Sequence, residues 1–347
     1  MFELDNILRK NIKDLKPYSS ARDEFKGNAS IFLDANENSY GTPLDKKYNR
    51  YPDPLQLNLK TKISKIKGLP IENIFVGNGS DEAIDILFRA FCNPGTDNVI
   101  IPFPTYGMYE VSANINDVAI QKAPLSQGFQ LDMDAISNAI DANTKLIFIC
   151  SPNNPTGNSF FREDIETILN NFNGIVVIDE AYINFSKQKS FIPELTEYPN
   201  LVVLQTLSKA WGMAGLRVGM ALASQQIIDV FNKVKPPYNI NEASQELAIK
   251  ALDNITQVND WIKIIVAERE KLAKELSNLK CIVKLYPSDS NFILAKVTDA
   301  NKIYEVLVGC GIIVRNRSSV AMCEGCLRIT VGTEKENAEL LNILKKF

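Results

Sequence analysis

Short apolar, β-branched segments alternate with amphipathic helical segments along most of the chain, and this alternation restricts the possible folds more than any other feature. The predicted strands are residues 73–77, 98–102, 145–150, 174–179, 201–205 and 216–222. Helical periodicity lies between several of them, as at 80–91 and 162–172. The pattern predicts an α/β fold, in which helices cover both faces of a mainly parallel sheet.

The alternation ends near the segment KPPY at 235–238, where two long helical segments follow, at 241–253 and 255–279. Strand-like segments come next, at 281–286, 291–297, 311–315 and 326–332, before a closing helical segment at 334–346. This order predicts a second, smaller α+β domain. We therefore expect an N-terminal arm at 1–29, a large domain at 30–238 and a small C-terminal domain at 239–347.

Composition and charge exclude several classes of protein. The formal net charge of −3 gives no reason to expect nucleic acid or an anionic membrane as a partner. No apolar run is long enough to span a membrane, and the first residues do not resemble a signal peptide, so we expect a cytoplasmic protein. The pair Cys323 and Cys326 forms a lone CxxC motif in a chain without histidine, so we expect no metal site. Acid–base chemistry must then use other side chains.

Lys209 is the first candidate for such chemistry. It follows the apolar strand at 201–205, within the segment TLSKAWGMAGLRVG at 206–219. A lysine among small residues at a strand end loses hydration, which is costly unless a partner or a reaction uses it. Taken alone, the residue could equally be a strand-end lysine that reaches back to solvent. Arg217 lies eight residues later, so an anion nearby would meet two cations.

The segment GNGSDE at 77–82 follows another predicted strand. It lacks the third glycine of a dinucleotide-binding fingerprint, because Glu82 stands there. Ser80 and Asp81 instead begin a helix, whose free amide groups and positive end can bind a phosphate. Simple capping of the helix by Ser80 explains the same residues.

Further polar residues stand at other strand ends. Asp179 ends an apolar strand, where a carboxylate needs a cationic partner such as a protonated pyridine nitrogen. Tyr182, three residues later, could reach the phenolic oxygen of the same ring, although Asp179 could also merely cap a loop. Asn154 lies in the turn SPNNPTG and offers an amide donor. Tyr106, in PTYGMY, offers a flat face for stacking or is an ordinary aromatic at a helix start.

Together these residues supply what pyridoxal 5'-phosphate needs: a lysine for its aldehyde, an acid, donors, a stacking ring and a phosphate site. Their order resembles that of the fold-type I, class-II pyridoxal-phosphate-dependent aminotransferases; the residues are Asn154, Asp179, Tyr182, Ser208, Lys209 and Arg217. The motifs LDANENSYG, RYPDP, GNGSDEAI, PTYGMY, CSPNNPTG, DEAYINF and CLRITVGT are similar to those of the histidinol-phosphate aminotransferases. The resemblance covers nearly the whole chain.

The resemblance implies both a cofactor site and a reaction. Lys209 would carry the cofactor and then move protons, and its pKa would be lowered by nearby cationic groups. Ser208 and Arg217 would hold the phosphate, together with backbone amides at Ser80 and Asp81. The reaction would transfer an amino group reversibly from L-glutamate to imidazole-acetol phosphate, giving L-histidinol phosphate.

The resemblance also implies substrate contacts and a homodimer with shared sites. Arg328 and Arg315 would bind substrate anions, since the planar guanidinium group suits both carboxylate and phosphate; Arg315 could instead pair with a surface acid. Tyr18 and Asn36 are further substrate-binding candidates. Tyr51 would reach the cofactor phosphate of the neighbouring subunit, or else pack on its own domain.

Three other functions remain possible at this stage. An aromatic amino-acid aminotransferase and a threonine-phosphate decarboxylase share the fold that the motifs imply. A non-enzymatic pyridoxal-phosphate sensor domain is disfavoured because no basic helix-turn-helix segment precedes the domain. Half-reactions with the different amino donors would separate these alternatives.

Overall fold

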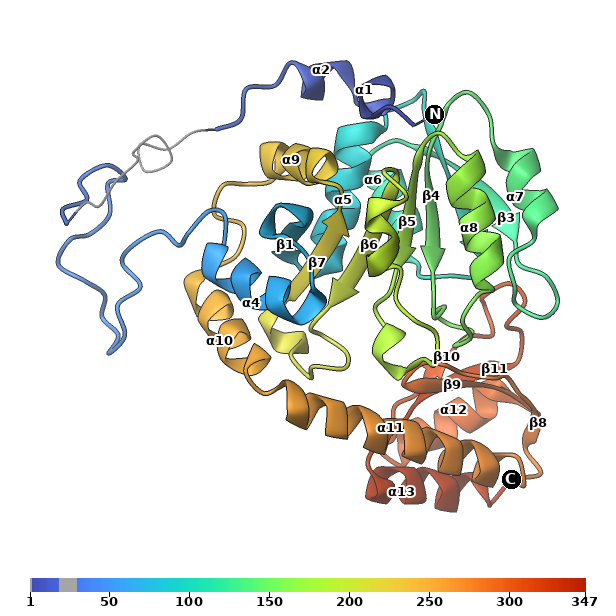
Figure 1. Cartoon of the computed structure of the whole chain (residues 1–347). Helices are drawn as coiled ribbons and strands as arrows, with labels where there is room; N and C mark the ends of the chain where they lie inside the picture. The colour runs from blue at the N-terminus through green and yellow to red at the C-terminus, as the bar shows by residue number, and fades with distance from the viewer. Residues whose placement is uncertain (1, 19–29) are drawn as a thin grey trace.

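The computed structural model describes residues 2–18 and 30–347, and its central feature is a seven-stranded sheet (Figure 1). The strand order is β1-β7-β6-β5-β4-β2-β3. The strands are β1 (Ile74–Asn78), β2 (Asn98–Phe103), β3 (Ala119–Pro124), β4 (Thr144–Cys150), β5 (Ile175–Asp179), β6 (Leu201–Thr206) and β7 (Val218–Ala223). Only β7 runs in the direction opposite to the other six strands, so the predicted mainly parallel sheet is confirmed.

Helices cover both faces of this sheet. In β4, Phe148 packs toward α5 (Ser80–Phe91), α6 (Met108–Ile115) and α9 (Gln225–Val234), whereas Ile147 packs toward the opposite face. On that opposite face lie α4 (Leu57–Lys67), α7 (Met133–Ala139) and α8 (Arg162–Asn171). Because both faces are buried, the strands need continuous apolar sequence, and this explains why most of them were predictable.

Two short helices near the N-terminus, α1 (Leu4–Ile7) and α2 (Lys10–Lys13), pack along the same body. The Arg9 amide donates to the Ala90 carbonyl at 3.1 Å, and Ile12 is buried. Residues 30–56 behave differently, because they contain no helix or strand and extend away from the body in Figure 1. Along them Ile31, Leu33 and Tyr40 are at least three-quarters exposed.

The C-terminal part contains a second sheet. The helices α10 (Glu242–Leu252) and α11 (Ile255–Leu276) lead to it, and α11 crosses beneath it with α13 (Glu334–Leu344) (Figure 1). Its strand order is β10-β11-β9-β8, all antiparallel. The elements are β8 (Ile282–Leu285), β9 (Phe292–Val297), α12 (Ala300–Gly309), β10 (Arg315–Asn316) and β11 (Cys326–Thr330). Leu294 and Leu327 are fully buried within this part.

The strand predicted at 311–315 is wrong for most of its length. Only Arg315 and Asn316 pair with β11, as the short strand β10. The Ile312 amide instead donates to the Leu307 carbonyl at 2.8 Å, so it completes the end of α12 rather than a sheet. The apolar residues of this segment therefore belong to the end of α12 rather than to a strand, and Ile313 among them is exposed.

The edge strand β3 was not predicted, because its sequence AIQKAP contains little apolar alternation and most of its residues are not buried. The limits of the arm and of the two domains at residues 29 and 238 stay predictions. Within residues 2–18 and 30–347, no helix is both long enough and apolar enough to cross a membrane.

Candidate active site

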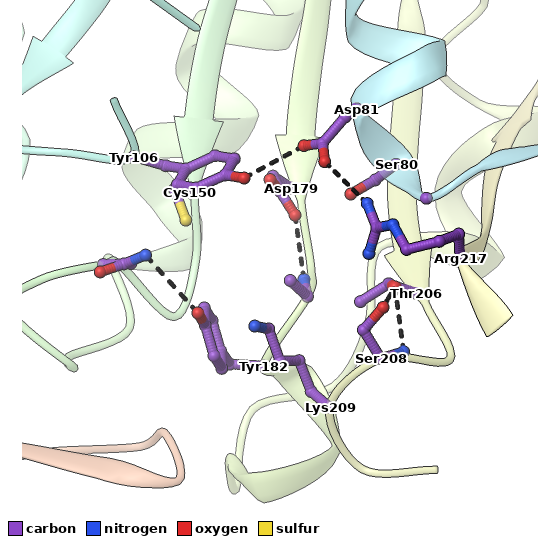
Figure 2. A pocket seen from close by; sticks show the side chains of 13 residues that line it. Ser80, Asp81, Tyr106, Cys150, Asp179, Tyr182, Thr206, Ser208, Lys209 and Arg217 are labelled. Carbon is purple, nitrogen blue, oxygen red and sulfur yellow. Dashed lines mark hydrogen bonds and ion pairs between the residues drawn. The ribbon is translucent and has the colours of Figure 1, made fainter. Parts of the chain in front are cut away.

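A cavity lies where the carboxyl ends of β4, β5 and β6 face the beginning of α5 (Figure 2). Nine of the residues selected from the sequence line it: Ser80, Asp81, Tyr106, Asn154, Asp179, Tyr182, Ser208, Lys209 and Arg217. They come from positions up to 137 residues apart, between Ser80 and Arg217. The parallel strands bring them together because these strands end at the same edge of the sheet.

Lys209 follows β6 and points its amine into the cavity, beside Tyr182 (Figure 2). The Nζ atom lies 5.5 Å from the centre of the Tyr182 ring. In the described part of the chain, no carboxylate lies within ion-pair distance of it. Partial burial lowers the pKa of Lys209, and the positive charge of Arg328 lowers it further. The direction matches the expectation, but burial rather than neighbouring cations is the main cause.

Asp179 ends β5 and is almost fully buried. Its Oδ2 accepts a hydrogen bond from the Tyr109 hydroxyl at 2.7 Å, and its Oδ1 accepts one from the Ala181 amide at 3.0 Å. Burial raises the pKa of Asp179 to about 6, although these two hydrogen bonds oppose the rise. The carboxylate therefore has donors but lacks a cation within ion-pair distance among the described residues.

Asn154 connects the two sheets at the cavity. Its Nδ2 donates to the Tyr182 hydroxyl at 3.5 Å, and its Oδ1 accepts from Nη1 of Arg328 on β11. Arg328 also lies over the Phe292 ring, 5.2 Å from its centre. Burial raises the pKa of Tyr182, so this phenol is neutral near pH 7 and can act as a hydrogen-bond donor.

The opposite end of the cavity is formed by the start of α5 and by Arg217. Gly79 is the N-cap of α5 and no side chain caps the helix, so Ser80 is the first helical residue and simple capping by Ser80 is not observed. Arg217 Nη2 lies 3.1 Å from Asp81 Oδ2, and the Tyr106 hydroxyl donates to Asp81 Oδ1 at 3.1 Å (Figure 2). The Ser208 amide donates to Thr206 Oγ1 at 3.1 Å.

Two glycines allow close contacts at this end, Gly79 with a side chain and Gly219 with the backbone. A Cβ atom at Gly79, whose φ is +74°, would lie 2.7 Å from Arg217 Nη2. A Cβ atom at Gly219 on β7 would lie 2.2 Å from the Ser80 amide nitrogen. No side chain fits at Gly219 without moving the start of α5, so β7 and the first turn of this helix are packed backbone to backbone.

The residues present fit pyridoxal phosphate. Free amides at the start of α5, with Arg217 and Ser208, suit a phosphate. The buried Asp179, which lacks a cationic partner in the described structure, suits a protonated ring nitrogen, and a lysine with a lowered pKa suits an aldehyde.

The comparisons with known proteins agree with this geometry. Residues 31–344 match the family model for aminotransferases of class I and II. The chain belongs to this family. A histidinol-phosphate aminotransferase of Cytophaga hutchinsonii is 57% identical to it over 346 residues, which cover 100% of this chain and 99% of the relative.

Solved structures show the same fold. The histidinol-phosphate aminotransferase of Clostridium acetobutylicum is 25% identical and has a TM-score of 0.80, covering 86% of this chain and 90% of that one. The corresponding enzyme of Sinorhizobium meliloti, in complex with pyridoxal-5'-phosphate, is 22% identical with a TM-score of 0.79, covering 90% and 89%. The predicted fold class of this aminotransferase is thus confirmed.

Five selected residues do not line the cavity of the aminotransferase, although one of them, Arg328, contacts the lining residue Asn154. Tyr18 is mostly exposed, and Arg315 is exposed on β10, in register with Arg328. Asn36 and Tyr51 line a separate cavity beside residues 238–243. There the Tyr51 ring stacks on Tyr238, with centroids 4.5 Å apart. The roles assigned to all the site residues stay predictions.

Three residues near the cavity were not selected from the sequence. Tyr109 holds Asp179 but is fully buried, so its sequence context is that of an ordinary core aromatic. Cys150 and Thr206 line the cavity at the ends of β4 and β6. Their positions at strand ends, within motifs that contain selected residues, could have identified both as lining residues of the site.

Proposed function

We propose that this aminotransferase transfers an amino group from L-glutamate to imidazole-acetol phosphate, forming L-histidinol phosphate in histidine biosynthesis. We also propose that it uses pyridoxal 5'-phosphate and acts as a cytoplasmic homodimer with shared active sites. The observation that carries the proposal is the single cavity in which Lys209 stands among Asp179, Tyr182 and Arg217. Full-length similarity to enzymes named histidinol-phosphate aminotransferase supports the choice of substrate.

When bound, pyridoxal phosphate would supply an aldehyde that condenses with amines and a ring that accepts electrons as a substrate Cα–H bond breaks. Arg217, Ser208 and the first amides of α5 would bind its phosphate. Asp179 would hold the proton on the ring nitrogen, because a buried carboxylate is best stabilised by a cation at that position.

Lys209 performs the proton transfer in this mechanism. Its lowered pKa leaves a larger fraction of the amine neutral near pH 7, so Nζ can take the proton from the substrate Cα and return it. Tyr182 and Asn154 orient groups by hydrogen bonds beside this amine. Arg328, which contacts Asn154, would bind the substrate anion next to the reacting atoms.

Absorbance of the cofactor-loaded protein tests the proposal directly. L-glutamate and L-histidinol phosphate should each convert the cofactor to its amine form, whereas L-phenylalanine and L-threonine phosphate should do so far more slowly. Faster conversion by phenylalanine would favour an aromatic aminotransferase. Release of carbon dioxide from threonine phosphate would favour a decarboxylase, and no conversion by any donor would indicate a non-enzymatic binder.

A further inference from the structure

A second cavity adjoins the candidate active site and has a volume of about 410 Å³. It shares Tyr106 and Asn154 with the first cavity, so the two are neighbours separated by these side chains. Its walls come from β2, β3 and α6 on one side and from the loop that follows β10 on the other. The loop contributes Arg317 together with residues 319–321.

Arg317 is the unsatisfied cation of this cavity. Its Nε atom is buried and has no hydrogen-bond partner within the described residues. Burial lowers the pKa of Arg317, and repulsion by Arg328 and Arg315 lowers it further. A buried Nε–H donor without an acceptor is unfavourable, because a donor that has lost water needs a partner.

Among the described residues, the two groups that favour the charged form of Arg317 do not offset its charge. The groups that favour its charged form are Cys323 and Tyr182. Burial raises the pKa of the Cys323 thiol to about 12 and also raises the pKa of the Tyr182 phenol, so both are neutral near pH 7. Glu110, the acid on the opposite wall, lies 2.9 Å from Lys122 and is already paired.

Three guanidinium groups therefore gather at this place: Arg328 on β11, Arg315 opposite it in register, and Arg317 two residues later. Across residues 2–18 and 30–347, none of the three has a carboxylate within ion-pair distance. One carboxylate of an amino acid needs one such group. A phosphate monoester carries nearly two negative charges and three acceptor oxygens at neutral pH, so it can bind more than one guanidinium group.

We propose that Arg317 is a specificity-determining residue that binds the phosphate group of the amino substrate, from the wall of the second cavity. This inference rests on the proposed function for the identity of the substrate. In this proposal, Arg317 makes the enzyme prefer phosphorylated over unphosphorylated amino donors. It takes no part in the proton transfer at Lys209.

The test compares Arg317→Gln and Arg317→Lys with the control Arg89→Gln, which removes the same charge from an exposed position on α5. Calorimetry on the cofactor-loaded protein measures binding of two unreactive probes, 3-(imidazol-4-yl)propyl phosphate and 3-(imidazol-4-yl)propanol. Arg317→Gln should weaken binding of the phosphate probe by roughly 10- to 100-fold, the effect of losing charge-assisted hydrogen bonds. Binding of the alcohol should change less than about twofold.

Kinetics give an independent measurement. For L-histidinol phosphate, Arg317→Gln should raise KM by the same factor and leave kcat within about twofold, since the lost contact binds ground state and transition state alike. Arg317→Lys should recover part of the loss, because it keeps the charge without the planar pair of donors. L-histidinol, which lacks only the phosphate, should show little change.

Equal weakening for both probes, a fall in kcat with unchanged binding, or the same loss in Arg89→Gln would overturn the inference. Failure of the unsubstituted protein to bind the phosphate probe would overturn it as well. If the proposed function is wrong but the inference about Arg317 is right, the result is different. The unsubstituted protein would then bind the probe through Arg317 but would not convert its cofactor with L-histidinol phosphate.

Discussion

The cofactor side of the candidate site and the segment 30–56 were predicted from motifs of similar quality, yet the structure treats them differently. At the cofactor side, nine selected residues from separate elements meet in one cavity. In the segment 30–56, Asn36 and Tyr51 lie in another cavity, and apolar residues such as Leu33 are exposed. The sheet assembles the first set within one chain, whereas the second set faces outward.

This difference shows that one folded chain can bring most of the predicted cofactor-binding residues together and still leave others, such as Tyr51, in a separate cavity. Exposed aromatic and apolar residues in an extended segment are typical of a surface that another protein covers. The contrast therefore supports the proposed homodimer, in which Tyr51 would serve the partner's site. Four experiments test this contrast between the two regions.

Lys209→Ala should have the largest effect, because Lys209 is the only lysine among the described residues that line the cavity. We expect transamination to fall by at least about 10⁴-fold in single-turnover assays, while the protein stays folded. Borohydride reduction of the unsubstituted protein, followed by peptide mapping, should place the pyridoxyl label on Lys209. The exposed Lys187, changed to alanine, serves as control, and a label at Lys187 or Lys233 would contradict the assignment.

Asp179→Asn should separate stability from activity. The pKa of Asp179 in the folded, cofactor-free chain is about 6, above the ordinary value of 3.8. The folded state thus holds this proton more tightly, so the group costs stability progressively as pH rises from 4 to 6 and by a constant amount above that. The difference corresponds to about 3 kcal/mol, so the variant should unfold at higher denaturant concentration at pH 8 but not at pH 4.

The same substitution should lower activity by roughly 10²- to 10³-fold, since a neutral amide does not stabilise a cationic ring nitrogen. Tyr109→Phe is the matched variant, because it removes one donor to Asp179 and keeps the carboxylate. It should move the acid limb of the pH–kcat profile to higher pH. An unchanged profile would show that Tyr109 acts only as part of the core.

Arg328→Lys tests the side of the site formed by the second sheet. We expect the cofactor to remain bound and KM to rise by roughly 10-fold for both L-glutamate and L-histidinol phosphate, because a point charge does not replace two parallel hydrogen bonds. Arg315→Ala should impair L-histidinol phosphate more than an uncharged aromatic amino acid. Equal impairment of both would remove Arg315 from phosphate recognition.

Mixed dimers test the outward-facing segment. Tyr51→Phe and Lys209→Ala chains should each have little activity alone. If Tyr51 serves the partner's site, a hybrid dimer contains one intact site, and an equal mixture should recover up to about a quarter of the unsubstituted activity. Verified hybrids without recovery would mean that Tyr51 acts within its own chain.

Most of the fold was predictable because the buried strands are apolar on both faces. β5, with the sequence IVVID, is buried throughout, and the polar Asp179 marks its end. β3 was missed because an edge strand needs less apolar sequence, and the strand at 311–315 was wrong because its apolar residues complete α12.

The candidate site was predictable where polar residues follow such strands, as at Lys209 and Asp179. Tyr109 was not, because a buried tyrosine that donates one hydrogen bond has the same sequence context as a core aromatic. Arg317 was passed over because loop arginines are usually solvated. Its Nε atom is buried at a cavity whose other wall is formed by α6 and β3, and local sequence does not encode how such distant segments meet.

The backbone contact at Gly219 determines which parts of the enzyme can be altered. Because any side chain there would collide with the Ser80 amide, a substitution at position 219 would displace β7 and the first turn of α5 from each other. A saturation library at position 219 should yield no variant that retains cofactor. Laboratory evolution toward new amino donors should therefore accumulate changes around Arg315 and Arg317, away from this backbone contact, and leave this end of the pocket untouched.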